Sequence, residues 1–105
     1  MSNSKLRDET VDYLFKAILS LETIDECYSF FEDIGTINEL KGFAQRLEVA
    51  RMLKESYKYS YISEHTGASP STISRVSRCL NYGADGYTLV LDRIMNEETT
   101  NKINE

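Results

Sequence analysis

The stretch from residue 59 to residue 80, YSYISEHTGASPSTISRVSRCL, constrains the fold of this chain more than any other part of the sequence. Gly67 is suited to end one short helix, because glycine adopts left-handed backbone angles without strain. Ser69 and Pro70 are typical of the cap and the first position of a second helix, where the N–H that proline lacks would have no partner. Two short helices joined by such a tight turn predict a helix-turn-helix.

The second predicted helix has two chemically different faces. Ile73, Val76 and Leu80 recur at helical spacing and predict the side packed against the protein. The other side carries hydroxyls and two arginines, and no carboxylate occurs between residues 69 and 80. These residue types suit the major groove of DNA, because arginine binds guanine edges or phosphate and hydroxyls bond either. The predicted DNA-binding residues are Ser69, Pro70, Ser71, Thr72, Ser74, Arg75 and Arg78.

The alternative interpretation is an ordinary surface helix pair, and the charge distribution bears on the choice. The net charge is −5, but it is unevenly spread along the chain. Residues 1–40 carry 3 Lys or Arg against 9 Asp or Glu, residues 41–82 carry 7 against 3, and residues 83–105 carry 2 against 5. The basic segment contains the predicted helix-turn-helix, so attraction to phosphate can be local in an acidic molecule.

The remaining sequence predicts further helices and no strand. Helices are expected over about 5–21, from 24 to Gly35, and from Thr36 to about 54, the last two opened by the capping boxes Thr23/Glu26 and Thr36/Glu39. A last helix is expected around residues 87–94, followed by a frayed polar tail over 96–105. The fold class is therefore all-α with about six helices. The spacing predicts these inner faces: Ile24, Cys27, Tyr28 and Phe31; Leu40, Phe43, Ala44, Leu47, Ala50 and Leu53; Tyr87, Val90, Leu91 and Ile94.

The length of 105 residues predicts one domain, and the absence of an apolar span or secretory signal predicts a cytoplasmic location without a membrane partner. The chain has too few cysteines and histidines for a disulfide framework or a zinc site: Cys27, Cys79 and the single histidine, His65. Both cysteines are expected to be small buried residues, and His65 is expected at the surface. No residue set predicts catalysis, so we expect neither an enzyme nor a metal or cofactor.

From about Gly35 to Ile94 the chain resembles the Trp repressor family, and the run TGASPSTISRVSRCLNYG is similar to its YerC/YecD-type branch. The resemblance implies an intertwined homodimer in which the N-terminal helices of two subunits interleave and the helix-turn-helix units protrude. The sequence independently favours partnering, because several thin amphipathic helices offer more apolar surface than one small core can hide.

The resemblance also implies a candidate effector pocket. Thr36, Arg46 and Arg75 match positions that hold tryptophan in the Trp repressor itself. Val76 stands where tryptophan binders carry glycine, and Cys79 stands where they carry serine. Because the branched side chain of Val76 would occupy the space of the indole ring, we do not expect tryptophan as a co-repressor. The sequence does not indicate another small effector.

The expected function is a dimeric transcriptional regulator that binds a two-fold-symmetric operator in double-stranded DNA, most simply as a repressor. The alternative is a helical dimer that binds a protein partner without specific DNA binding, which the acidic N-terminal third favours. The steep salt dependence of phosphate contacts separates the two interpretations.

Overall fold

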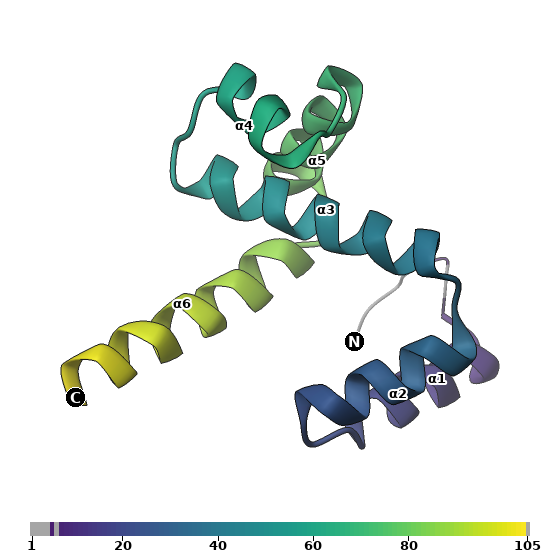
Figure 1. Cartoon of the computed structure of the whole chain (residues 1–105). Coiled ribbons are helices and arrows are strands. Elements are labelled where there is room, and N and C mark those ends of the chain that lie inside the picture. Colours follow the sequence, from purple (N-terminus) through teal and green to yellow (C-terminus); the bar gives the residue numbers. More distant parts are fainter. Residues whose placement is uncertain (1–4, 6, 105) are drawn as a thin grey trace. The chain divides into compact units, whose positions relative to one another are not determined.

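The computed structural model describes residue 5 and residues 7–104, and this part contains six helices and no strand (Figure 1). This confirms the predicted all-α class. The chain divides into two compact units, residues 1–40 and residues 41–105, and α3 begins in the first unit and ends in the second. The helices are α1 (Glu9–Leu19), α2 (Ile24–Ile34), α3 (Ile37–Lys54), α4 (Tyr59–Thr66), α5 (Pro70–Tyr82) and α6 (Gly86–Asn104).

Side-chain caps fix where the first three helices begin. The Asp8 carboxylate accepts the Val11 N–H at 2.8 Å, so α1 starts at Glu9 and not near residue 5 as predicted. Thr23 caps α2 as predicted, accepting the Glu26 N–H at 3.1 Å. At the start of α3 the capping box is reciprocal: the Glu39 N–H donates to Thr36 Oγ1 at 3.1 Å, and the Thr36 N–H donates to Glu39 Oε1 at 2.9 Å.

The helices of the first unit bury no residue. The predicted inner face of α2 is therefore wrong for this chain alone: Ile24 is 75% exposed, Tyr28 is 59% exposed, and Cys27 is exposed. In α1 the apolar residues at helical spacing are better covered: Val11, Leu14 and Ile18 are half-buried, whereas Phe15 is 53% exposed. Both helices have an apolar stripe at helical spacing, and neither stripe is fully buried within the first unit.

The buried core lies in the second unit, where α3, α4, α5 and α6 meet. It includes Ile62 from α4, Ala68 from the turn, and Ile73 and Val76 from α5, and these last two are 0% and 1% exposed. This confirms the predicted inner face of α5 at those two positions. Leu91 of α6 completes the cluster, whereas Val90 and Ile94, predicted on the same face, are 42% and 40% exposed.

The buried side of α3 differs from the predicted seam. Ala50 is buried and Leu53 packs against the core, as predicted, whereas Phe43 is 58% exposed and Leu47 is 37% exposed. Val49 and Met52, which lie outside the predicted seam, are also buried. The difference arises because the C-terminal half of α3 contributes to a core shared with α4, α5 and α6, so it is buried around a wide arc and not along one stripe.

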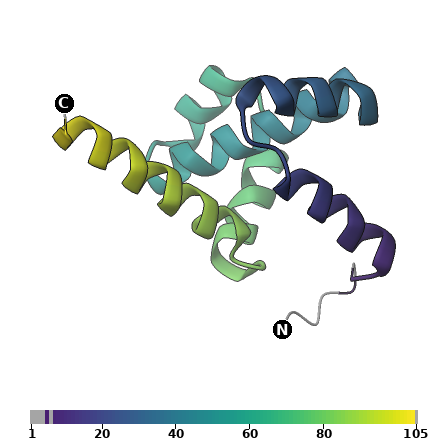
Figure 2. The same cartoon turned by 90° about the horizontal axis from the view of Figure 1, so that it is seen from below.

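Helix α6 is longer than predicted and continues to Asn104 through the segment expected to be frayed. Residues 96–104 contain neither glycine nor proline, so nothing in them stops a helix. In Figures 1 and 2 its C-terminal half extends away from the other helices of the second unit. Lys54 Nζ and Asp92 Oδ1, 2.8 Å apart, join α3 to α6. None of the described helices is both long and apolar enough to cross a membrane.

Candidate nucleic-acid interface

The turn between α4 and α5 has the conformation that its sequence predicts. Gly67 has φ 75°, in the left-handed region, and its N–H donates to the Ser63 carbonyl, which ends α4. The Ser63 hydroxyl donates to the Ala68 carbonyl at 2.9 Å, and the Ala68 N–H donates to Thr66 Oγ1 at 3.1 Å. These local bonds, together with the burial of Ala68, hold the two helices in one defined arrangement.

Helix α5 begins as predicted, with Ser69 as its cap and Pro70 at its first position. The Thr72 N–H donates to Ser69 Oγ at 3.2 Å. Ser69 Oγ also lies 3.0 Å from Thr72 Oγ1 and 3.1 Å from Ser71 Oγ, so three hydroxyls share one network at the start of the helix. The network leaves donors and acceptors at the surface, ready for base edges or phosphate oxygens.

The structure brings the predicted DNA-binding residues together on the outer side of α5. Ser69, Pro70, Ser71, Ser74, Arg75 and Arg78 are exposed, whereas Thr72 is half-buried. The ion pairs of the described residues involve neither arginine. Arg51 of α3, in contrast, is paired: it donates hydrogen bonds to Glu48 and Glu55. The hydrogen bond to Glu48 raises the pKa of the Arg51 guanidinium.

Two contacts around this surface escaped the sequence patterns. Gln45 of α3 donates from Nε2 to the Thr66 carbonyl at 3.2 Å, across 21 residues, and so ties the end of α4 to α3. The ring of Tyr57, just before α4, stacks on that of Tyr61 at a centroid distance of 5.2 Å, and the rings of Tyr61 and His65 stack at 5.8 Å. His65 is exposed, as expected. In the sequence, only the spacing of four residues between Tyr57, Tyr61 and His65 could have indicated this ring stacking.

The candidate effector residues lie in different settings. The Thr36 hydroxyl caps α3, and the Arg46 guanidinium lies 5.0 Å from the centroid of the Phe43 ring. Val76 is packed in the core, whereas Arg75 is exposed. Cys79 is also exposed, so the prediction of two buried cysteines is wrong. Cys79 lies beside the inner stripe of α5 and not on it.

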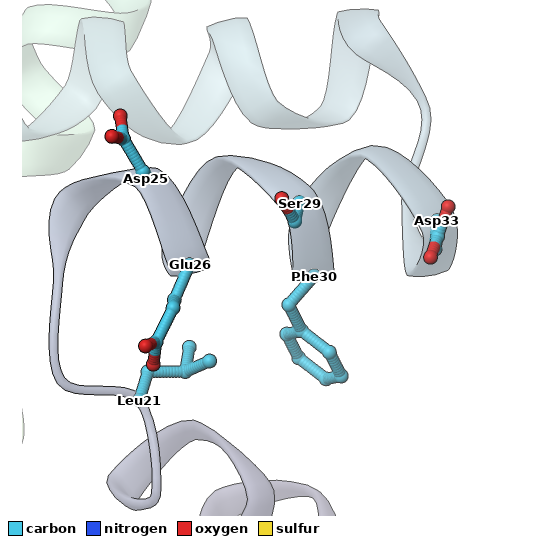
Figure 3. Close-up of a pocket in the computed structure, with 6 residues that line it drawn as sticks. All are labelled: Leu21, Asp25, Glu26, Ser29, Phe30 and Asp33. Atoms are coloured by element: carbon cyan, nitrogen blue, oxygen red, sulfur yellow. The ribbon is translucent and has the colours of Figure 1, made fainter.

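A separate hollow of about 410 Å³ lies in the first unit (Figure 3). Glu26 and Phe30 point to the same side as Leu21, whereas Asp25 points to the other side, so the carboxylates do not converge. Among the residues that the structure describes, no three His, Cys, Asp or Glu side chains are grouped so that they could hold a metal ion.

The capped α5, the tight left-handed turn and the α3–α6 core define a helix-turn-helix domain of the Trp repressor class. Residues 9–95 match the family described as Trp repressor protein, and the chain belongs to that family. The predicted resemblance is thereby confirmed.

Three relatives show how far the similarity extends. The uncharacterized protein YerC of Bacillus subtilis (strain 168) is 57% identical over 99 residues, which cover 94% of this chain and 95% of YerC. The crystal structure of a Trp repressor candidate from Staphylococcus aureus matches with a TM-score of 0.84 and 51% identity, over 90% of this chain and 94% of that chain. A TrpR-like protein from Eubacterium eligens ATCC 27750 matches with a TM-score of 0.84 and 56% identity, over 88% and 95%.

Proposed function

We propose that this protein is a cytoplasmic, dimeric transcriptional regulator, most simply a repressor, that binds a two-fold-symmetric DNA operator. The main support for this proposal comes from the residues on the outer side of α5. This side presents hydroxyls and two arginines without an ion-pair partner among the described residues, on a helix whose cap and preceding turn are fixed by hydrogen bonds. Membership of the Trp repressor family supports the same function.

The dimer in this proposal rests on the uncovered apolar residues of the first unit. Leu19, Ile24 and Ile37 are 85%, 75% and 72% exposed, and isolated helices of this length are marginal in water without packing. A second copy of the chain would cover these stripes and would present two α5 helices related by a two-fold axis. The two helices would then read two half-sites about one helical turn of DNA apart.

The acidic first unit, with 9 Asp or Glu against 3 Lys or Arg in residues 1–40, favours a second candidate function, a module that binds a protein partner. A salt titration of binding to labelled duplex DNA distinguishes the two. The proposal predicts that log affinity falls linearly with log salt, by about 0.9 per phosphate neutralised. A chain that binds no duplex even at low salt would favour the interaction module.

A further inference from the structure

Glu64 is the single carboxylate of the helix-turn-helix. No other Asp or Glu occurs between residues 56 and 84. It is exposed on α4, and the ion pairs of the described residues do not include it. A negative charge without a cationic partner among the described residues therefore lies within the basic part of the chain that we propose binds DNA.

This carboxylate borders the start of α5. A surface hollow of about 410 Å³ separates the outer side of α4 from the first turns of α5. Its lining residues are Tyr59, Ser60, Ser63 and Glu64 from α4, and Pro70 and Ile73 from α5. Because the first turns of α5 are the part that enters the major groove in helix-turn-helix docking, Glu64 would lie beside the bases that these turns contact.

The chemistry of a carboxylate limits what it can face there. An ionised Glu side chain only accepts hydrogen bonds. In the major groove the base donors are the N4 amino group of cytosine and the N6 amino group of adenine, and carboxylates pair with cytosine N4. Guanine O6 and N7, thymine O4 and every phosphate oxygen are acceptors, so a carboxylate desolvated against them would be unpaired and repelled.

We propose that Glu64 is a specificity-determining residue of the DNA interface, which accepts a hydrogen bond from a cytosine amino group beside the bases read by α5. The inference rests on the proposed function and adds a base preference to it. DNA sequences without cytosine opposite Glu64 would bind less tightly. Glu64 would therefore give selectivity in two ways, by bonding cytosine and by repelling bases that present only acceptors. A merely structural role, stabilising α5 through its helix dipole, would change stability and leave base preference unaltered.

The test compares the wild type with Glu64→Gln and with the control Glu98→Gln, which removes an equal charge from the exposed side of α6. Each protein selects from random duplexes, and its affinities for the duplex most enriched by the wild type and for a scrambled duplex are measured. Glu64→Gln should lose the cytosine preference at one symmetric pair of positions. Its ratio of selected to scrambled affinity should fall about fivefold or more, which corresponds to roughly 1 kcal/mol. Glu98→Gln should keep the cytosine preference and the wild-type affinity ratio.

Either of two results would overturn the inference: an unchanged motif and ratio in Glu64→Gln, or equal changes of affinity for both duplexes. A fall in the melting temperature of free Glu64→Gln with base preference intact would assign the residue a structural role instead. A wild type that enriches no sequence refutes the proposed function itself. A selective wild type with an equally selective Glu64→Gln refutes the role of Glu64 alone.

Discussion

Ser56 occupies a backbone conformation that suits glycine better. It has φ 67°, and its N–H and that of Tyr57 donate to the carbonyls of Leu53 and Met52, the bond pattern of a Schellman motif. An L-residue with a side chain in the left-handed region costs about 1 kcal/mol or more. Ser56→Gly should therefore raise the free energy of unfolding by roughly 0.5–1 kcal/mol, measured by denaturant unfolding.

The same change in a helix provides the control for Ser56→Gly. Ser60 is exposed within α4, where glycine is less favourable than serine. Ser60→Gly should destabilise the protein. Destabilisation by both variants would mean that the Ser56 side chain contributes contacts that outweigh its backbone strain.

Val76 makes the chain differ from tryptophan binders at the residue scale. Its side chain is 1% exposed within the core, at the position where the resemblance to the Trp repressor implies a glycine in tryptophan binders. Millimolar tryptophan should therefore neither raise the melting temperature nor tighten DNA binding. Thermal unfolding with and without the ligand measures this directly, because a ligand that binds only the folded state must stabilise it. A stabilisation of about 1 kcal/mol or more would show that a pocket persists beside Val76.

The two exposed arginines of α5 should have different roles. Arg78 lies almost one turn beyond Arg75, further from the first turn that enters the groove, so it is better placed for flanking phosphates. Arg78→Ala should weaken binding to all sequences alike and reduce the slope of log affinity against log salt by about one per half-site. Arg75→Ala or Ser71→Ala should cost roughly 1–3 kcal/mol on the preferred duplex and relax one symmetric pair of base positions.

Salt titrations of each variant on preferred and scrambled duplexes measure these roles. If Arg78→Ala alters base preference while the other two lower affinity uniformly, α5 lies in the groove differently from the proposal. If none of the three changes binding, α5 is not the reading helix.

At the scale of the element, the start of α3 gives the protein a defined response to acid. Hydrogen bonding to Thr36 lowers the pKa of Glu39 below its usual value of 4.5. The Thr36 backbone N–H contributes most, and the Thr36 side chain contributes less. A lowered carboxylate pKa gives stability that is present above the unfolded value of 4.5 and is lost as pH falls through the folded value. Glu39→Gln should therefore lose less stability than the wild type between pH 6 and about pH 3, in urea unfolding curves. Equal losses would contradict this role of the capping box.

The caps of α2, α3 and α5 could be read from the sequence, and features set by distant contacts could not. The start of α1 was missed although its Asp8 cap is also local. Gly67, Ser69 and Pro70 fixed the turn and the start of α5 because their conformational preferences act within a few residues. The outer side of α5 followed from those boundaries. The buried arc of α3 and the bond from Gln45 to Thr66 depend on residues far apart in the chain. Cys27 is exposed on a helix that buries none of its residues, which its local spacing could not indicate.

At the scale of the whole molecule, the uncovered stripes of α1 and α2 predict an obligate dimer. Sedimentation equilibrium at micromolar concentration should give about twice the chain mass of 12.1 kDa. The melting temperature should rise with protein concentration, because mass action links the stability of a dimer to its concentration. A monomer that melts cooperatively at a temperature independent of concentration would contradict the dimer.

In the proposed function, a dimer of this chain reads a symmetric DNA sequence through α5. Selection of bound fragments from random duplex DNA by the purified full chain tests it most directly. We expect an enriched motif of two inverted half-sites, centred about 10 base pairs or a multiple of that apart. Ser71→Ala and Arg75→Ala should each change the motif within the half-sites. No enrichment at low salt, or an enriched motif without two-fold symmetry, would contradict the proposed function.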